Sequence, residues 1–471
     1  MALCGVRPQH RRVRARGKEG KTDMRRASTW RRFLVPVAAA TLVVAACGTD
    51  DEEAAPAPPP PPATEAPAPD PEPPPPPEPE PPAPAPEPPP APEPEAPAAV
   101  GFDIDAVLAA DLDDCAPAPS GDPLKIGFAA DLSDLGGFAD APASQAAAYF
   151  IDLINCTGGV NGAPLELTIQ NIEGDPDVTQ RAAQDLLDAG VSAILGPPFP
   201  DFGFPLLQVT AGRVPVLFVA STEPTLSDPA QLAFLVAFDD TAQAGAAAEF
   251  ALGEGWTTAV TFSSPGPYFG YNPEVFTEVF EAGGGTVIAD YNYVPIEDVD
   301  FSSQANEMAN LDAPPDVVYS AMLAFQAAIL RGQLDGVGVE TRFLITDAFE
   351  ATGGYAEGEA VEGFYHTTHS FPAAGSRVVI LDEGFEAATG AALENPSFGG
   401  LAADAIAMVI DAFLRTGSHD PAVLGAAIAE AQGVEGVTGV LSYPAGSGSP
   451  IKPVYVHQVV NGAPSLAGTV G

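Results

Sequence analysis

Basic residues are scarce in this chain, with 19 Lys and Arg against 63 Asp and Glu in 471 residues. Eleven of the basic residues precede residue 47, where there are only two acids, so the remainder carries 8 bases and 61 acids. The formal net charge of that remainder is near −53, the difference between these two counts. Such a surface repels nucleic acids and anionic lipid headgroups. We therefore expect no nucleic acid partner and interpret the charge as a source of solubility.

The chain also lacks the short motifs of common enzyme classes. It contains no GxSxG nucleophile elbow, no phosphate-binding GxxxxGK[ST], no HExxH and no CxxC. Histidine is rare, with five in all. His366 and His369, in the sequence HTTH, have no cysteine or group of acids near them in the sequence, and we interpret them as hinge or surface residues. We expect neither catalysis nor a cofactor nor a metal ion.

The basic residues that are present gather in a leader. Four arginines between residues 25 and 32 precede an apolar stretch from 33 to 46, which is shorter than a membrane-spanning helix and typical of a signal peptide. The stretch ends in VAAC, which resembles a bacterial lipobox, in which the cysteine is diacylated and becomes the mature N-terminus. We therefore expect residues 1–46 to be leader and signal peptide. A start at Met24 would give a signal peptide of ordinary length. Cys47 would anchor the protein on the extracytoplasmic side of the bacterial cell membrane, an uncleaved signal anchor being the alternative.

Proline is concentrated in one tract, because residues 51–100 hold 25 of the 53 prolines, mixed with Glu and Ala. This composition cannot build a core and favours an extended polyproline II conformation. At ~3.1 Å per residue, such a tract would reach on the order of 150 Å. We expect residues 47–122 to consist of the lipidated cysteine, this disordered tether and a short N-terminal segment.

Cysteine is scarce as well, with four in the chain. Cys4 lies in the leader and Cys47 is the expected lipidated residue, so Cys115 and Cys156 are the two other cysteines of the mature chain. Because an extracytoplasmic compartment is oxidising, we predict a disulfide between these two. It would join the segment before the first strand to the end of the first helix. Two separate buried thiols are the alternative.

From about residue 123 to 467, short apolar runs alternate with helical stretches. Strands are expected at 124–129, 165–170, 191–195, 214–220, 257–262, 286–293, 316–320, 342–346 and 361–367. Near the C-terminus, 437–442 and 453–460 are predicted to form a β pair. Nearly continuous apolar strands that alternate with helices indicate parallel sheets covered on both faces. The sequence therefore predicts an α/β fold of two doubly wound, Rossmann-like units, with a cleft at the carboxyl ends of their strands.

Several segments resemble, in order along the chain, the type I periplasmic binding proteins. They are LKIGFAADLSDLGGFAD, INCTGGVNGAPLELTIQNIEGDP, QDLLDAGVSAILGP, PVLFVASTEPTL, APPDVVYS, GLAADAIAMVIDAFLRTG and GVTGVLSYPAGS. The chain is most similar to the branched-chain amino acid group of that family, the leucine/isoleucine/valine-binding proteins of ABC transporters. The resemblance covers about three quarters of the chain, from about residue 123 to 460.

The resemblance implies two lobes joined by three chain crossings, near residues 239–240, 367–370 and 437–438. Lobe 1 would comprise residues 123–238 and 371–436, and lobe 2 would comprise residues 241–366 and 439–467. Three crossings form a hinge, and closure of the lobes around a ligand is the expected motion.

The resemblance also implies a binding site, formed by loops after strands 1, 3 and 4 of lobe 1 and closed by an aromatic residue and an acid of lobe 2. Besides the loop at 135–138, the matching residues are Phe202, Phe204, Ser221, Thr222, Tyr268, Phe269, Leu323 and Asp347. Thr222 would donate to an oxygen of the ligand, and Asp347 would accept from its ammonium or hydroxyl group. The simpler interpretations are a turn residue for Thr222, a helix N-cap for Asp347, and core packing for Tyr268 and Phe269.

The loop after strand 3 departs from the family pattern, since it reads GPPFPDFGF from 196 to 204. Pro200 has no amide and stands where the family usually has a hydroxyl, while Asp201 would repel a carboxylate. The phenylalanines offer apolar contact instead. We therefore expect a small organic solute that is amino acid-like or has an apolar or aromatic part, and that is not strongly anionic. A branched-chain amino acid is the alternative, if the Ser221 amide replaces the lost contact.

Together these features predict a monomeric lipoprotein that binds a small solute and delivers it to the permease of an ABC transporter. A ligand-sensing receptor domain of the same fold, coupled to a signalling partner, is the alternative. In either role the membrane would be contacted through the lipid anchor.

Overall fold

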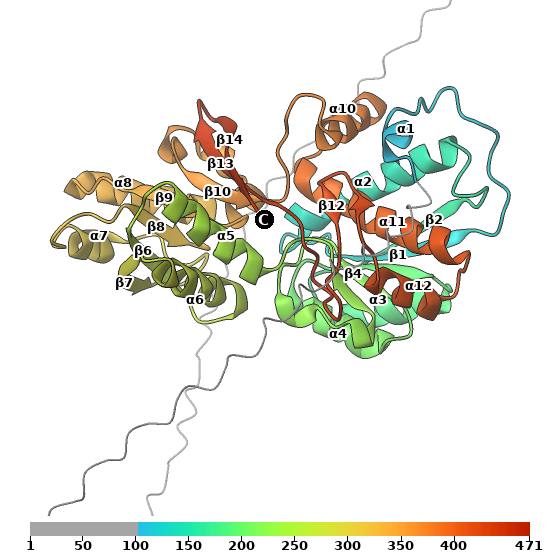
Figure 1. Cartoon of the computed structure of the whole chain (residues 1–471), viewed down its shortest axis with the longest axis horizontal. Coiled ribbons are helices and arrows are strands. Elements are labelled where there is room, and N and C mark those ends of the chain that lie inside the picture. Colours follow the sequence, from blue (N-terminus) through green and yellow to red (C-terminus); the bar gives the residue numbers. More distant parts are fainter. Residues whose placement is uncertain (1–101) are drawn as a thin grey trace, which may run out of the picture. The chain divides into compact units, whose positions relative to one another are not determined.

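The computed structural model describes residues 102–471 of the chain. The expectations for the signal peptide, Cys47 and the proline-rich tether therefore lie outside the described residues. The described residues form two large β-sheets, each with helices packed on both of its faces (Figure 1). This arrangement confirms the predicted α/β fold with two Rossmann-like units.

The first sheet has five strands in the order β2-β1-β3-β4-β5, and every neighbouring pair is parallel. Its strands are β1 (Leu124–Ala130), β2 (Leu165–Asn171), β3 (Ala193–Gly196), β4 (Val216–Phe218) and β5 (Ala233–Leu235). Strands β3, β4 and β5 are buried along their whole length. Burial on both faces is the reason that such strands appear in the sequence as continuous apolar runs.

Helices cover both faces of this sheet. On one face lie α2 (Gly137–Cys156), α10 (Arg377–Thr389), α11 (Pro396–Thr416) and α12 (Pro421–Ala429), and on the other lie α3 (Pro176–Asp188) and α4 (Pro200–Thr210). Within the described residues, α11 is the one helix long and apolar enough to cross a membrane, yet nearly all of it is buried, as in the core helix of a globular domain. We call this sheet with its helices lobe 1.

The second sheet has seven strands in the order β14-β13-β10-β9-β8-β6-β7. Five of them run parallel: β6 (Thr258–Ser263), β7 (Thr286–Asn292), β8 (Val317–Ser320), β9 (Arg342–Ile345) and β10 (Tyr365–Thr368). One face is covered by α5 (Asp240–Gly253) and α6 (Pro267–Ala282), and the other by α7 (Ser302–Met308) and α8 (Ala324–Val337). We call this sheet with its helices lobe 2.

The C-terminal strands pair differently from the prediction. Strand β13 (Val454–Val460) lies antiparallel between β10 and β14 (Ala463–Val470), whereas β12 (Val440–Leu441) pairs with β11 (Val434–Glu435). The predicted β pair is therefore wrong. The reason is local, because Asn461 and Gly462 both have positive φ and form the two-residue turn that closes a hairpin between β13 and β14.

The folded part begins earlier than residue 123. Helix α1 (Ile104–Leu108) packs its apolar side chains into the core of lobe 1, and Asp105 forms two hydrogen bonds of 2.7 and 2.9 Å with the Arg377 guanidinium. The predicted disulfide between Cys115 and Cys156 is present. It ties this N-terminal segment to the end of α2.

The segment that precedes β13 packs with lobe 1. Residues 439–451 stay with lobe 1, since Leu441 and Tyr443 are buried in its core and the Gly448 carbonyl accepts a 2.7 Å hydrogen bond from the Leu235 amide at the end of β5. The Tyr443 hydroxyl donates to the Leu235 carbonyl at 2.7 Å. Residues 439–451, which the resemblance assigns to lobe 2, thus pack with lobe 1, and the chain joins the sheet of lobe 2 at β13.

Candidate functional site

Three of the predicted site residues follow strands at their carboxyl ends. Thr222 lies four residues after β4 in lobe 1, Tyr268 lies in the first turn of α6 after β6, and Asp347 lies two residues after β9. The carboxyl ends of parallel strands share one edge of a sheet, and open α/β sheets bind their ligands at that edge. Ser221, Thr222 and Asp347 are all buried.

Asp347 is the centre of a hydrogen-bonded cluster. Its Oδ1 accepts from the Gln243 amide nitrogen at 2.7 Å and lies 2.5 Å from the Tyr268 hydroxyl, and its Oδ2 lies 3.1 Å from His369 Nε2. Although Asp347 stands at the N-cap position of α9 (Ala348–Ala351), its side chain caps no backbone amide. Through these hydrogen bonds the carboxylate joins α5, α6 and the segment after β10. A residue that only caps a helix would not make these contacts.

The protonation of this cluster follows from burial. Burial raises the pKa of the Tyr268 phenol well above its usual range, and the carboxylates of Asp347 and Asp240 add to the effect. Burial also lowers the pKa of His369, which stacks on the Phe238 ring at 4.1 Å, although the hydrogen bond to Asp347 opposes that shift. At neutral pH, Tyr268 is therefore an uncharged donor and His369 an uncharged imidazole.

Several buried polar atoms next to this cluster have no partner within the described residues. They are both carboxylate oxygens of Asp240, the side-chain oxygens of Gln243 and Ser221, and Nδ1 of His369. They belong to one neighbourhood, because the Asp240 amide donates to the Thr222 carbonyl at 2.8 Å and Gln243 lies one turn further along α5. Burial raises the pKa of Asp240 well above its usual range, and the charges of Asp347 and Glu223 raise it further. With a neutral His369, the side-chain oxygen of Gln243, Nδ1 of His369 and the Asp240 carboxyl can accept hydrogen bonds, and Asp240 also donates one when it is protonated.

Asp240, Gln243 and His369 were not among the predicted site residues. Asp240 and His369 stand at two of the three chain crossings, and the HTTH sequence could have drawn attention to His369. Nothing in the sequence distinguishes Gln243 from an exposed helical glutamine.

The predicted loop after β3 is instead a short turn followed by α4, with Phe199 at the N-cap position and Pro200 first in the helix. Proline is favourable there because the first helical amides have no partner within the helix. Phe202 consequently points into the core of lobe 1 among Phe218 and Leu226, while Phe204 is 42% exposed.

Two other phenylalanines lie nearer to the strand ends of lobe 1. Phe138 and Phe199 are half-buried, with ring centroids 6.0 Å apart. Phe138 also lies 6.3 Å from Phe398, which in turn lies 6.2 Å from the His369 ring. These contacts join an aromatic wall in lobe 1 to the Asp347 cluster. Phe138 belongs to the predicted loop at 135–138, and Phe199 belongs to the predicted loop at 196–204 but was not among the named site residues.

The remaining predicted residues of lobe 2 serve partly as packing. Phe269 is half-buried against the core of lobe 2, with its ring edge-on to Tyr268 at 5.3 Å. Leu323 is half-buried at the N-cap position of α8. Neither side chain contributes a polar group.

Hydrogen bonds connect the two lobes beside this cluster. Glu350 of lobe 2 accepts hydrogen bonds from the Thr368 hydroxyl and, at 3.1 Å, from the Ser397 hydroxyl at the start of α11 in lobe 1. Ser370 and Ser397 hydroxyls lie 2.9 Å apart. Burial raises the pKa of Glu350.

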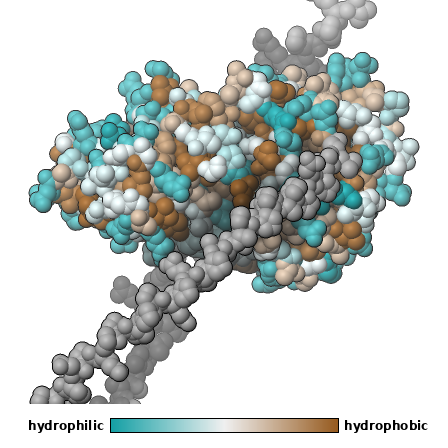
Figure 2. All heavy atoms as spheres, in the orientation of Figure 1, coloured by the Kyte–Doolittle hydropathy of each residue, from teal (hydrophilic) through white to brown (hydrophobic). Residues whose placement is uncertain are grey.

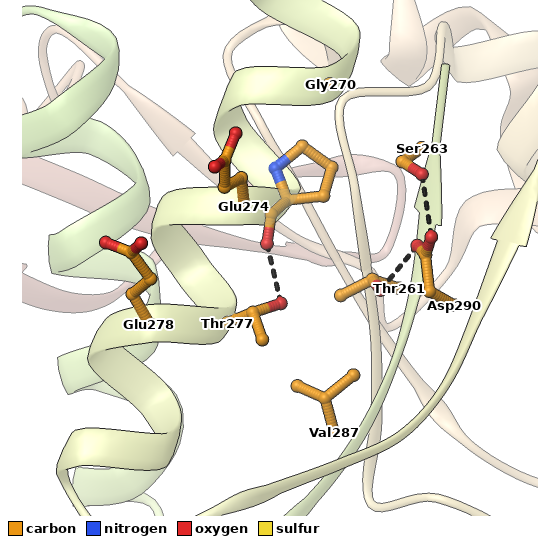
Figure 3. A pocket seen from close by; sticks show the side chains of 9 residues that line it. Thr261, Ser263, Gly270, Glu274, Thr277, Glu278, Val287 and Asp290 are labelled. Carbon is orange, nitrogen blue, oxygen red and sulfur yellow. Dashed lines mark hydrogen bonds between the residues drawn. The ribbon is translucent and has the colours of Figure 1, made fainter. Parts of the chain in front are cut away.

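Two surface hollows lie elsewhere. One, of about 320 Å³, is lined in lobe 2 by α6, β6 and β7, and its carboxylates are Glu274, Glu278 and Asp290 (Figure 3). Asp290 accepts from the hydroxyls of Thr261 and Ser263 at 2.8 and 2.9 Å. The other, of about 440 Å³, lies between α5 and residues 444–452. Neither hollow is lined by a predicted site residue, and residues 102–471 contain no group of three or more His, Cys, Asp or Glu that could hold a metal ion.

Similar structures share this architecture across most of the chain. A leucine-binding protein from Thermotoga maritima is 22% identical, covering 74% of this chain and 98% of its own, with a TM-score of 0.60. The branched-chain amino acid substrate-binding protein of Streptococcus pneumoniae, in complex with isoleucine, is 20% identical, with coverages of 74% and 98% and a TM-score of 0.62. A solute-binding protein from R. palustris, in complex with benzoate, is 19% identical, with coverages of 74% and 96% and a TM-score of 0.59.

No curated protein sequence matches the chain significantly. A family model described as periplasmic binding protein matches residues 123–464, which include both lobes. Members of this family bind ligands and are not enzymes, in agreement with the absence of catalytic motifs. The chain therefore belongs to the periplasmic binding protein family, with the type I fold of the branched-chain amino acid group.

Proposed function

We propose that this protein is an extracytoplasmic receptor that captures a small organic solute and delivers it to the permease of an ABC transporter. The observation that carries this proposal is the buried polar cluster around Asp347, which lies at the strand ends where periplasmic binding proteins hold their ligands. It joins Tyr268, Gln243 and His369, with Thr222 of lobe 1 beside it. Within this proposal, Cys47 anchors the receptor to the membrane and the protein acts as a monomer.

The cluster favours a solute that carries hydrogen-bond donors. Its free atoms can accept hydrogen bonds, and none of the described lysines or arginines belongs to it. Lys452, the one buried lysine among residues 102–471, is 3.7 Å from Asp404 and is paired with it. A carboxylate brought into this site would meet buried acids and no unpaired cation of the described residues, which is costly away from water. An ammonium, amide or hydroxyl group fits better.

Aromatic residues favour an apolar or aromatic part in the same solute. Phe138 and Phe199 are half-buried near the cluster, and Phe204 is exposed on α4. Large rings supply contact area in such sites. In this proposal Thr222 and Ser221 contact the polar end of the solute from lobe 1, while Tyr268, Phe269, Leu323 and Asp347 meet it from lobe 2. Phe202, buried in the core, supports the aromatic wall from behind.

Matched pairs of small molecules test this chemistry. Leucine, leucine methyl ester and 4-methylpentanoate share one apolar skeleton, and benzylamine and benzoate share another. Binding only to the folded state raises stability by RT ln(1 + [L]/Kd), about 2.7 kcal/mol at 100 times Kd. We expect leucine, leucine methyl ester and benzylamine to raise the unfolding temperature. The rise caused by 4-methylpentanoate and by benzoate should be at least tenfold smaller.

Calorimetry measures the affinities of the same compounds and can contradict this proposal. Sub-micromolar binding of leucine that is lost on esterification, or tight binding of benzoate, would show that the site grips a carboxylate. If no compound in a wider library of amines, hydroxyl compounds and amino acids stabilises the protein, the receptor role itself is contradicted.

A further inference from the structure

A loop of lobe 2 exposes three aliphatic side chains close together in the sequence. The loop joins β7 to α7, and Val294, Ile296 and Val299 are 48%, 64% and 59% exposed. On the viewed face of the molecule, hydrophobic residues form small groups among hydrophilic ones (Figure 2). Exposed apolar side chains that gather in one place mark interaction surfaces more often than isolated ones do. We call residues 294–299 the 294–299 loop.

Ile296 has an unfavourable backbone conformation. Its φ is 70°, in the left-handed region, where a β-branched residue is a genuine outlier. Such a conformation persists only where the surrounding structure enforces it, and it is typical of functional loops. Ile296 is more exposed than either valine of the loop, so burial of its own side chain does not compensate for this conformation.

The loop is held in place by a buried glutamine of α8. Gln326 accepts from the Ile296 amide at 3.2 Å and donates to the carbonyls of Val294 and Asp298 at 3.2 and 2.9 Å. The Val294 amide also donates to the Asp298 carboxylate at 2.8 Å. The backbone is thus fixed from inside while the aliphatic side chains face solvent. A surface fixed in advance loses less entropy on binding a partner.

The loop lies at the same edge of the sheet as the Asp347 cluster. It follows β7, which is parallel to β6, and Tyr268 follows β6. The Tyr293 ring at the root of the loop is 6.5 Å from Phe269, whose ring is 5.3 Å from Tyr268. The loop is therefore two aromatic side chains away from the proposed solute site.

We propose that the 294–299 loop is the contact of lobe 2 with the membrane permease, with Ile296, Val294 and Val299 entering an apolar pocket that has a basic rim. The basic rim follows from charge, because Glu297 and Asp300 are exposed beside the aliphatic residues and no lysine or arginine lies between residues 293 and 301. A second copy of the chain would bring like charges together, which disfavours it as the partner. This inference rests on the proposed transport function.

Site-specific crosslinking tests the contact directly. The photoreactive residue p-benzoylphenylalanine is placed at position 296 of the full-length chain, in cells that contain its transporter. Ile451 is the matched control, because it is 63% exposed and lies in residues 439–451 of lobe 1, outside the 294–299 loop. We expect a crosslink from position 296 to a permease subunit, identified by mass spectrometry, at a yield at least tenfold above that from position 451. Equal yields, no crosslink from position 296, or a crosslink only to a second copy would overturn the inference.

Variants separate docking from folding. Ile296→Gly relieves the left-handed strain, so its unfolding temperature should equal or exceed that of the wild type, and a clear fall would show that Ile296 serves folding. The double variant I296S/V299S should bind the compounds tested above as the wild type does, and its crosslinking from a probe at position 294 should fall at least tenfold. Unchanged crosslinking in this variant would overturn the inference. Failure of the wild type to bind any solute would count against the proposed function alone, since the crosslinking needs no solute.

Discussion

The proposed site depends on a few hydrogen bonds around single atoms. The Tyr268 hydroxyl lies 2.5 Å from Asp347, 2.7 Å from Thr346 and 3.2 Å from the Ala348 amide. One phenol thus orients the acid and satisfies the first amide of α9. Because these groups are at least partly buried, water does not readily replace a lost partner.

Tyr268→Phe should destabilise the protein by about 1–3 kcal/mol, the cost of leaving a buried polar group without its partner. It should also weaken solute binding, because Asp347 loses the group that orients it. Urea unfolding and calorimetry measure the two effects. Tyr271→Phe is the control on the same helix, since its hydroxyl bonds Thr241 at 3.0 Å in an exposed position. Equal effects of the two substitutions would contradict the central role of Tyr268.

Asp240 should make stability dependent on pH. Burial raises its pKa in the folded protein above its unfolded value, so the folded state binds the proton more tightly. This contribution to stability is fully present below the unfolded pKa and is lost as pH rises towards the folded pKa. Asp240→Asn should therefore lose less stability than the wild type between pH 4 and pH 7. Asp239→Asn, at the half-buried N-cap position of the same helix, should follow the wild-type profile, and thermal unfolding across this range compares the three proteins.

At the scale of elements, the N-terminal segment of lobe 1 is held in place by contacts with distant parts of the chain. Helix α1 and the following turn are held by the Arg377–Asp105 ion pair and by the disulfide of Cys115 and Cys156. The ion pair is exposed on the aspartate side and contributes little by itself. The disulfide is therefore the main covalent or ionic constraint on this segment.

The substitution pair C115S/C156S should lower stability by up to about 4 kcal/mol, the chain-entropy value for a loop of this length. The two cysteines are 41 residues apart in the sequence. Thermal unfolding with and without reductant measures the loss, and the variant should be insensitive to reductant. Mass spectrometry of the unreduced wild type that found both thiols free would contradict the bridge.

At the scale of the whole molecule, charge and anchoring act together. The chain after residue 46 is strongly acidic, so an anionic membrane surface repels it. In the proposed arrangement the lipid on Cys47 supplies attachment, and the proline-rich tract sets the distance from the membrane. The 294–299 loop then presents its aliphatic residues to the permease.

Cys47→Ser should release the protein into the medium or block its processing, because the acyl chains supply the membrane affinity at ~0.8 kcal/mol per buried methylene. Fractionation of cells and medium, with mass spectrometry of the N-terminus, measures the outcome. C115S/C156S, which leaves the lipobox intact, should still fractionate with membranes. A Cys47→Ser protein that is cleaved and remains in the membrane fraction would contradict the anchor.

The sequence by itself determined the elements and much of the architecture. Apolar runs located strands such as β1 and β9. The Asp175 side chain caps α3 and Pro176 stands first in the helix, which is the ordinary local pattern of a helix start. These signals are local, since strand periodicity and helix caps depend on residues within a few positions of each other. The disulfide also followed from counting cysteines, because only two remained to pair.

Only the tertiary structure decided which side chains meet. Gln243 and Asp347 are 104 residues apart and His369 is 22 residues beyond Asp347, so no local pattern could join them. Phe202 was expected at the site, but the helix that begins at Pro200 turns its ring into the core. Residues 439–451 pack with lobe 1, where the Tyr443 ring lies 5.4 Å from that of Phe234. These outcomes depend on packing between distant segments, whereas periodicity reports only how each segment divides its residues between core and solvent.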